Sequence, residues 1–378
     1  MSIKLAEVEG SNGFLTSTAN QSLEIINLHL LEKEAKETMH KGAFGYIREG
    51  AEDETVLKRN LTCWETKKIL PRMLANVEEP TTNTSFLGIP LTMPIISTPV
   101  AAQTLCHVEG ELNTARALNK LGSIFCLSAY GSTLIEDAAK AGNGGSQFFQ
   151  LYMSKNDDFN KYTLEKAREH GYKAIILTAD ATVGGYREDD IINKFTFPFP
   201  LANLAAFAAS TEIGSDSGSS LADVFKAAKQ ALEPNDIAKL KEFSGGLPII
   251  LKGVQSVLDA EIAIHAGVDA IGVSNHGGRQ LDGAPGSFEV LPDIAKIVNK
   301  RVPIIFDSGI RRGSHVFKAI AAGADIVALG RPFMYGMHLG GEKGIISVFE
   351  HLQKELLINM QLAGTRTIDD IKKTLLVD

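Results

Sequence analysis

A histidine and an arginine lie three residues apart in the stretch Ser274-Asn275-His276-Gly277-Gly278-Arg279-Gln280. The stretch follows an apolar run, so both side chains are expected where a buried strand reaches the surface. The paired glycines allow a tight turn and a close approach of the backbone to a ligand. An imidazole can accept a proton and a guanidinium can grip a carboxylate, so the motif suits chemistry on a small organic acid. A strand end with a capping histidine and a solvated arginine is the alternative for this motif alone.

Further polar residues follow other apolar runs of the chain. Thr178-Ala179-Asp180 ends one run and Lys252-Gly253 ends another. If a barrel brings these two run ends together with the histidine motif, Asp180 could raise the basicity of His276. Lys252 sits on a buried run, where it could neutralise an anionic cofactor or form a Schiff base. A lysine that only extends to the rim is the alternative.

Two further groups of residues suggest anion sites. The stretches Asp307-Ser308-Gly309-Ile310-Arg311-Arg312-Gly313 and Gly330-Arg331 combine small residues, which expose backbone N–H groups, with arginines. This combination is typical of a phosphate site, with ordinary turn glycines as the alternative. A carboxylate could be held by Arg187, Arg279, Tyr46 and Tyr152, although Tyr46 could equally be a helix residue that packs on a barrel.

The elements that would position these residues recur from residue 93 onward. Helical patterns alternate with the apolar runs and several end in a glycine that precedes the next run, as in αβ loops. Eight such units predict a (β/α)8 TIM barrel. An open doubly wound sheet is the rival, but its GxGxxG motif is missing. The eight runs are Pro94–Val100, Ser123–Ala129, Gln147–Met153, Ala174–Asp180, Pro248–Val254, Ala270–His276, Pro303–Gly309 and Ile326–Pro332.

The remaining segments complete the expected organisation. Residues 1–20 are polar and predict a flexible arm, and helical patterns over residues 21–59 predict an N-terminal extension. The fourth unit contains a long insertion, about residues 185–232, which includes the Gly/Ser run 214–220 and predicts a lid over the rim. Residues 343–362 form an amphipathic helical pattern. We expect one domain over residues 21–365 and a C-terminal tail over residues 366–378.

Composition limits the function classes. The chain has 378 residues, 44% of them hydrophobic, which is ample for a large core. A net charge of −7 argues against nucleic acid or an anionic membrane as a partner. Cys63, Cys106 and Cys126 show no CxxC spacing, which predicts reduced cysteines in a cytoplasmic protein and no metal site. Neither a signal peptide nor an apolar run near the ~18 residues of a membrane span is found.

Taken together, these motifs closely resemble the FMN-dependent α-hydroxy acid oxidase/dehydrogenase family, and within it the bacterial oxidases that act on L-lactate. The resemblance runs from about residue 30 to residue 365, and the heptad 274–280 is its most specific part. It implies FMN as cofactor, oxidation of a small L-2-hydroxy acid, with L-lactate to pyruvate expected, and O2 as acceptor giving H2O2. A homotetramer is implied by the resemblance only.

The resemblance also assigns roles to residues. His276 would be the base, with Asp180 behind it and Tyr130 near substrate and flavin. Arg187, Arg279 and Tyr46 would hold the substrate carboxylate, and Tyr152 the hydroxyl. Lys252 would stabilise negative charge on the flavin. The other residues assigned to FMN are Thr98, Val100, Ala101, Ser128, Gln150, Thr178, Ser274, Asp307, Ser308, Gly309, Arg311, Gly330 and Arg331.

One residue departs from the resemblance, and several alternatives stay open. Phe207 in the insertion occupies a position where lactate-oxidising relatives carry a lid tyrosine, so a hydroxyl is lost there. This bears on substrate choice and product release. A dehydrogenase or a lactate 2-monooxygenase of the same family is the first alternative. A Schiff-base aldolase that uses Lys252 and a non-catalytic FMN-binding module are more distant ones.

Overall fold

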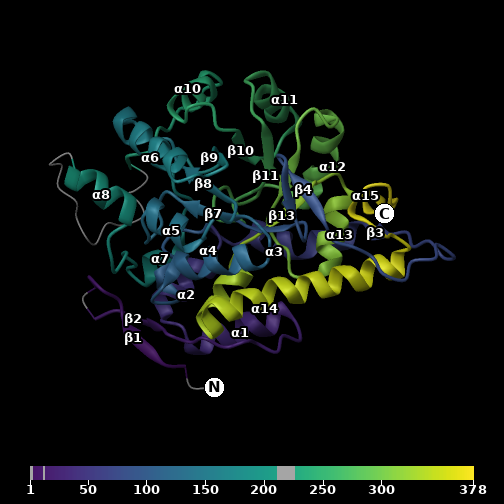
Figure 1. Cartoon of the computed structure of the whole chain (residues 1–378), viewed down its shortest axis with the longest axis horizontal. Coiled ribbons are helices and arrows are strands. Elements are labelled where there is room, and N and C mark those ends of the chain that lie inside the picture. The colour runs from purple at the N-terminus through teal and green to yellow at the C-terminus, as the bar shows by residue number, and fades with distance from the viewer. Residues whose placement is uncertain (1–2, 12, 211–225) are drawn as a thin grey trace.

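The barrel is the centre of the molecule (Figure 1). The computed structural model describes residues 3–11, 13–210 and 226–378. Eight strands form one parallel sheet in the order β6-β13-β12-β11-β10-β9-β8-β7. The sheet closes between β6 and β7, where the Ser97 N–H donates to the Ile124 carbonyl at 3.2 Å and Val100 bridges Leu127. The predicted (β/α)8 barrel is therefore confirmed.

Each of the eight predicted apolar runs contains one barrel strand. All eight are buried almost throughout, which explains why the runs are apolar rather than alternating. The strands are β6 (Ile95–Ser97), β7 (Phe125–Ser128), β8 (Gln147–Leu151), β9 (Ala174–Thr178), β10 (Ile249–Val254), β11 (Ala270–Val273), β12 (Ile304–Phe306) and β13 (Ile326–Leu329).

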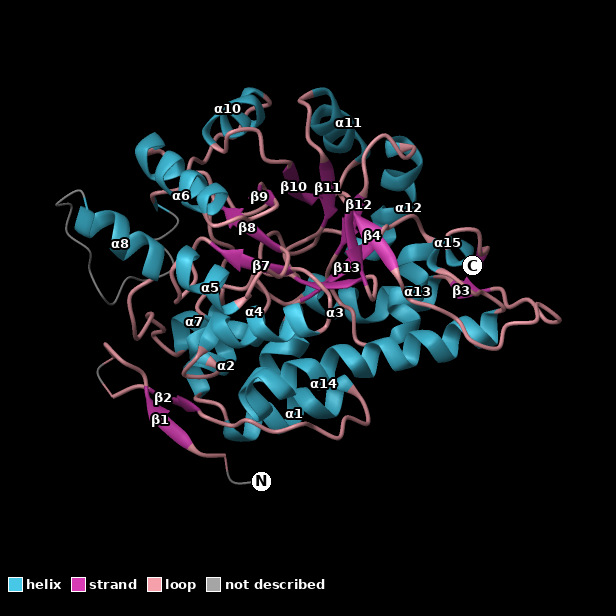
Figure 2. Ribbon diagram, viewed as in Figure 1, coloured by secondary structure: helices cyan, strands magenta, loops and turns pink. Residues whose placement is uncertain are grey.

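Helices surround the strands (Figure 2). They are α4 (Gly110–Lys120), α5 (Ile135–Ala141), α6 (Asp157–Glu169), α10 (Asn235–Phe243), α11 (Val257–His265), α12 (Ser287–Val298), α13 (Gly313–Ala321) and α14 (Arg331–Ala363). Helix α14 begins twelve residues before the predicted pattern at residue 343. It bends at Gly341, whose φ of 58° is left-handed, so the apolar periodicity is continuous only after the bend.

The barrel interior is packed, and a hairpin closes one end. Strands β4 (Thr84–Phe86) and β5 (Ile89–Leu91) form this hairpin just before β6. Phe86 and Leu91 are buried in one cluster with inward-facing residues such as Ile96, Phe148 and Ile305. The open end is therefore the opposite one, where the strands finish and polar residues gather.

The helical extension also takes shape before the barrel. It consists of α1 (Leu28–Thr38), α2 (Lys41–Arg48) and α3 (Thr55–Thr62), followed by a short 3₁₀ helix at Cys63–Thr66. A second 3₁₀ helix, Gln103–Leu105, lies within the barrel region, after β6. Helix α1 packs along α14 (Figure 1). These contacts place α2 beside the open end of the barrel, where it can contribute side chains to a site.

The two chain ends differ from expectation. Residues 1–20 contain a hairpin, β1 (Leu5–Glu7) with β2 (Leu15–Ser17), instead of a loose arm. Thr16 and Ser17 are buried, and the Thr16 hydroxyl donates to the Leu105 carbonyl at 3.1 Å. In the C-terminal tail, α15 (Ile368–Ile371) packs on α13, and β14 (Leu376–Val377) pairs with β3 (Lys68–Ile69). The polar sequence of these segments shows no strand pattern. Their strands were therefore not predicted, because short edge strands form only by pairing with residues distant in the chain.

The insertion after β9 contains two described helices, α7 (Glu188–Ile192) and α8 (Ala202–Ser210). The predicted Gly/Ser run 214–220 lies outside the described residues. Phe207 of α8 packs on Phe159 and Tyr162 of α6, with ring centroids 5.3 and 5.4 Å away. Within the described ranges, no helix is both long and apolar enough to cross a membrane.

Candidate active site

A cavity of about 1000 Å³, its open mouth included, lies at the carboxyl end of the barrel. This volume is at the upper end of the range typical of ligand sites, about 300–1000 Å³. Sixteen predicted site residues line it: Tyr46, Thr98, Val100, Ala101, Tyr130, Tyr152, Arg187, Lys252, His276, Arg279, Asp307, Ser308, Gly309, Arg311, Gly330 and Arg331. Sequence-distant residues thus converge on one space, as the barrel predicted.

Five other predicted residues lie behind the cavity wall. Asp180 stands behind His276, as described below. Ser128, Gln150 and Thr178 form a chain of hydrogen bonds across β7, β8 and β9, at 3.0 Å for each link. The Ser274 hydroxyl donates to the Asp307 carboxylate at 2.6 Å. In this structure these four polar side chains therefore bond to one another and to the lining, rather than facing the cavity directly.

The heptad 274–280 is held in a strained turn directly after β11. His276, Gly277 and Gly278 all have left-handed φ angles, of 56°, 67° and 77°. A left-handed conformation costs a non-glycine residue about 1–2 kcal/mol, so His276 is held there by its surroundings. A Cβ atom on Gly278 would lie 2.6 Å from the Leu57 backbone nitrogen, which explains the glycine. The turn is pressed against α3 and aims the imidazole into the cavity.

One wall of the cavity contains His276, Asp180 and Lys252, and we call it the base wall. The His276 Nδ1 atom lies 2.8 Å from Asp180 Oδ1, and Lys252 Nζ lies 3.6 Å from Asp180 Oδ2. Asp180 and Lys252 are both almost fully buried. The proposed acid–base pair between strands four and six is therefore within hydrogen-bonding distance, and the lysine balances the charge of the carboxylate.

These charges control protonation. Burial alone would raise the pKa of Asp180, but Lys252 and His276 hold it below its usual value, so Asp180 is ionised. Burial, with the nearby Lys252 cation, lowers the pKa of His276 to about 4. His276 is thus neutral at neutral pH. With Nδ1–H donating to Asp180, its Nε2 lone pair is free to accept a proton.

The opposite wall contains Arg187, Arg279 and Tyr46, and we call it the arginine wall. Arg187 donates to the Gln280 side chain at 3.3 Å and weakly to the Arg279 carbonyl. Arg279 donates to the Ile47 and Glu49 carbonyls and lies over the Tyr46 ring, 5.2 Å from its centroid. Burial lowers the pKa of Arg187 to about 10. Within the described ranges, neither guanidinium has a carboxylate partner within 4 Å, so the wall is electrostatically ready for an anion.

Aromatic rings complete the two walls. Tyr130 stacks on Tyr152 with ring centroids 4.7 Å apart, and Tyr152 lies 6.5 Å from the His276 ring. Tyr46 packs against Phe195 and Phe197 at the start of the insertion. Burial raises the pKa of Tyr130, Tyr152 and Tyr46, so their hydroxyls stay protonated and can donate hydrogen bonds.

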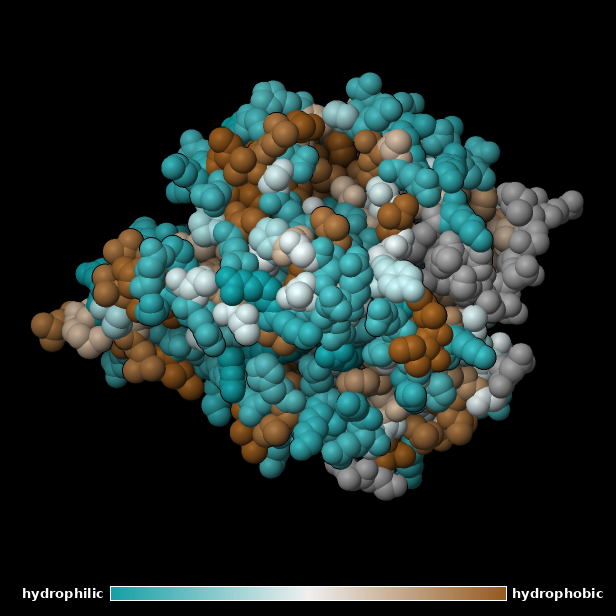
Figure 3. Space-filling model, turned by 180° about the vertical axis from the view of Figure 1, so that it is seen from behind, coloured by the Kyte–Doolittle hydropathy of each residue, from teal (hydrophilic) through white to brown (hydrophobic). Residues whose placement is uncertain are grey.

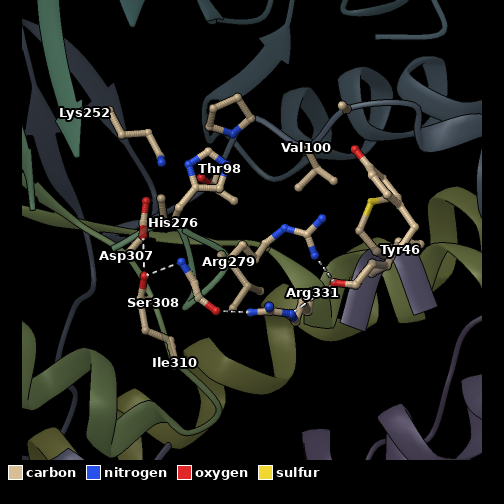
Figure 4. A pocket seen from close by; sticks show the side chains of 18 of the residues that line it. Tyr46, Thr98, Val100, Lys252, His276, Arg279, Asp307, Ser308, Ile310 and Arg331 are labelled. Atoms are coloured by element: carbon tan, nitrogen blue, oxygen red, sulfur yellow. Dashed lines mark hydrogen bonds between the residues drawn. The ribbon is translucent and has the colours of Figure 1, made fainter. Parts of the chain in front are cut away.

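A second cationic region lies after β12 and β13. Figure 4 shows Arg331 with Ser308 and Ile310 in this part of the cavity. Arg331 donates to three backbone carbonyls, and burial lowers its pKa to about 9. The Arg311 Nε atom is buried without a hydrogen-bond partner. A Cβ on Gly309 would lie 1.9 Å from the Asn60 carbonyl oxygen, so the turn requires glycine.

These features fit FMN. An elongated ligand with a phosphate at one end needs cations at that end, and Arg311 and Arg331 supply them. Its flavin end needs backbone groups and a nearby positive charge, which residues 98–101 and Lys252 provide. Among the described side chains, no cluster of three or more His, Cys, Asp or Glu is placed to bind a metal ion.

Several residues at the site were not foreseen. Ile47, Pro99, Phe197, Gly277, Ile310, Ala328, Leu329 and Met334 also line the cavity. Gln280 has no chemistry of its own, yet its amide donates to the Asp180 and Val183 carbonyls at 3.0 and 2.7 Å. Together with its bond from Arg187, this links the base wall to the arginine wall. Its place in the heptad was the only available signal. Phe207 is not among the described lining residues. It was expected in a lid over the rim, whereas in the structure its ring packs on α6.

Comparisons with known proteins identify the family of the chain. The FMN-dependent dehydrogenase family model matches residues 35–378. The chain is 50% identical to an L-lactate oxidase of Lentilactobacillus hilgardii, over 97% of this chain and 98% of that one. It is 39% identical to human 2-hydroxyacid oxidase 1, over 93% and 96%. A crystal structure from Pediococcus acidilactici, assigned as a lactate oxidase, superposes with a TM-score of 0.92 at 51% identity, over 97% and 98%. The chain therefore belongs to the FMN-dependent dehydrogenase family.

Proposed function

We propose that the protein oxidises L-lactate to pyruvate with FMN as cofactor and passes the electrons to O2, giving H2O2. One observation carries the proposal: a neutral, carboxylate-oriented His276 faces a buried Arg187 and a half-buried Arg279, and among the described residues neither guanidinium has a carboxylate partner within 4 Å. A base opposite a carboxylate clamp is what a 2-hydroxy acid requires. The names of the relatives, L-lactate oxidase and 2-hydroxyacid oxidase, support the choice of substrate.

The proposed roles follow from position. Arg187, Arg279 and Tyr46 bind the carboxylate, which turns the carbinol carbon toward the base wall. The Tyr152 hydroxyl donates to the substrate oxygen, and Tyr130 packs behind it. His276 Nε2 accepts the hydroxyl proton, and the resulting imidazolium is stabilised by Asp180.

FMN, when bound, supplies the two-electron acceptor chemistry. We propose that Thr98, Val100, Ala101, Ser128, Gln150, Thr178 and Ser274 serve its flavin and ribityl portions. Asp307, Ser308, Gly309, Arg311, Gly330 and Arg331 would serve its ribityl and phosphate portions, and Lys252 would hold negative charge on the ring system.

A stoichiometry measurement tests the function. With L-lactate in air, an oxidase should consume one O2 and release one pyruvate and one H2O2 per turnover. Acetate and CO2 without peroxide would indicate a monooxygenase, and pyruvate without O2 uptake a dehydrogenase. A protein that does not lose its yellow colour anaerobically with any short 2-hydroxy acid would disprove the proposal. D-lactate is the matched control, because it has the same charge and atoms with the opposite configuration.

Two finer points are part of the same proposal. We propose a cytoplasmic location, which the three buried free cysteines support. We also propose a homotetramer of a single FMN-binding domain. In Figure 3 apolar atoms gather on the protruding end at the left edge. Met73 and Leu74 are 71% and 103% exposed. Leu362 and Leu375 are also exposed, and they lie beside the loop that contains Met73 and Leu74. Light scattering of the wild type and Leu74→Asp tests the assembly, since an assembly that uses this surface should weaken.

A further inference from the structure

A pair of buried carboxyl groups lies directly behind the arginine wall. Glu49 ends α2, the helix that carries Tyr46, and it is 1% exposed. Asp190 lies in α7, three residues after Arg187. The Asp190 backbone N–H donates to Glu49 Oε2 at 3.0 Å, and the two carboxyl groups lie close enough to interact. The pair therefore joins the helix of Tyr46 to the segment of Arg187.

The pair has too few donors for two carboxylates. Glu49 Oε1 and both carboxyl oxygens of Asp190 are buried with no hydrogen-bond partner. Two ionised carboxylates in contact in a buried site repel each other and lose hydration, unless one of them keeps a proton. A single shared proton supplies a donor that can join one oxygen of each carboxyl group. Burial, and then the contact with Asp190, raises the pKa of Glu49 to about 8.

The surrounding charges give this proton a consequence for binding. Arg187 and Arg279 are the cations that act on Glu49. The Glu49 carbonyl also accepts from Arg279 at 3.1 Å and from Arg331 at 2.9 Å. On α2, Tyr46 is neutral and Arg48 is paired with Glu54 at 2.6 Å. Asp189 is the neighbouring carboxylate on α7.

The net charge follows from these groups. With one proton on the pair, Arg187, Arg279 and the pair sum to +1, which a monoanionic substrate neutralises. Without the proton the sum is zero, and a carboxylate enters a wall with no net attraction. The charge of Arg331 does not contribute to this balance because its proposed partner is the FMN phosphate.

We propose that Glu49 and Asp190 are positioning residues that share one proton, and that this proton sets the charge of the arginine wall so that a 2-hydroxy carboxylate binds tightly only while it is held. The inference rests on the proposed function, since it takes the substrate carboxylate as the anion of this wall. It adds a linkage between substrate binding and proton binding at a site that does not touch the substrate.

Calorimetry with oxamate tests the linkage in the FMN-loaded enzyme. Oxamate is a non-reacting analogue of pyruvate whose charge stays at −1 between about pH 6 and pH 10. Its Kd should be constant below about pH 8 and rise above it, by up to about tenfold per pH unit. Titrations at about pH 9 in buffers of different ionisation enthalpy should show uptake of up to one proton per oxamate bound.

The variants separate this linkage from a structural role. Glu49→Gln keeps the size and adds an amide donor, so oxamate should bind with the low-pH Kd at every pH and with no proton uptake. Asp190→Asn should behave in the same way, and it provides a second test if one variant fails to retain flavin. Asp189→Asn is the matched control on the same helix and should keep the wild-type pH dependence.

Two results would overturn the inference: a wild-type Kd that stays flat to about pH 10, or a Glu49→Gln enzyme that keeps the wild-type rise and proton uptake. Lactate turnover at neutral pH separates the two proposals. If the enzyme oxidises lactate but shows no linkage, only the proposal of a shared proton is disproved. If it shows the linkage but oxidises no 2-hydroxy acid, only the proposed function is disproved.

Discussion

The two walls of the cavity carry similar charged groups but balance them in opposite ways. In the base wall, Asp180 lies between His276 and Lys252, so every charge has an internal partner. In the arginine wall, Arg187 and Arg279 donate only to neutral groups among the described residues. In Figure 4, Lys252 and His276 lie on one side and Tyr46 on the other. The first wall is preorganised for proton transfer, and the second awaits a charge from the ligand.

The largest effect should come from breaking the base wall. His276→Ala removes the proton acceptor while Lys252 and the phosphate region remain, so flavin should be retained. We expect kcat to fall by about 10²–10⁴-fold or more. Steady-state kinetics with L-lactate measures the loss, and the visible absorbance of the purified variant checks the flavin. A variant within about tenfold of wild type would exclude His276 as the base.

Breaking the arginine wall should affect binding more than chemistry. Arg279→Lys and Arg187→Lys keep the charge but lose the planar, bidentate donor set. Loss of one charged hydrogen bond, about 1.5–3 kcal/mol, predicts a KM for L-lactate about 10- to 150-fold higher. The oxamate Kd should rise in parallel. If kcat alone falls and KM is unchanged, the arginines do not bind the substrate carboxylate.

A smaller effect should separate the electrostatic role of Lys252 from its role at FMN. The base form of His276 exists above its pKa, so on the acid side kcat/KM of the wild type should stay level until pH drops toward about 4. Lys252 helps to lower that pKa, so in FMN-saturated Lys252→Met the acid limb should move to higher pH. Flavin affinity should also weaken. Lys241→Met, at a partly exposed ion pair with Asp269, is the control and should leave the limb unchanged.

The smallest effect is expected at Phe207. Its ring packs on α6 rather than on either wall, so Phe207→Tyr should change kcat/KM by less than about threefold. Phe197→Tyr is the matched comparison, because Phe197 lines the cavity and contacts Tyr46. A change of KM with Phe207→Tyr larger than that with Phe197→Tyr would show that Phe207 reaches the substrate.

The barrel and most of the cavity were predictable, because both follow from local patterns. Buried parallel strands are continuous apolar runs, and the residues after them meet at one rim whatever their separation in sequence. Tyr46 is different. Its helix lies outside the barrel, so the sequence pattern left binding a carboxylate and packing on the barrel equally open for it, and its position depends on the packing of α1 and α2 against α14.

What could not be predicted depends on three-dimensional packing between segments without strong patterns. Residues 1–20 are polar, yet their hairpin is anchored at Ser17, which forms a bridge with His107. The Glu49–Asp190 pair joins two residues 141 positions apart that look like ordinary surface acids in the sequence. Ser128, Gln150 and Thr178 were expected at the cofactor, but their mutual bonds can be seen only once the strands are in register.

The hairpin that seals the far end of the barrel limits the path by which substrate and product can move. With Phe86 and Leu91 filling that end, nothing passes through the barrel axis. Under the proposed function, the substrate therefore enters and the product leaves by way of the rim. In a cavity that opens at the rim, the departing product competes with the arriving substrate for the same arginines. We expect pyruvate to act as a competitive inhibitor. When product accumulates, the rate of product release should then limit the turnover rate.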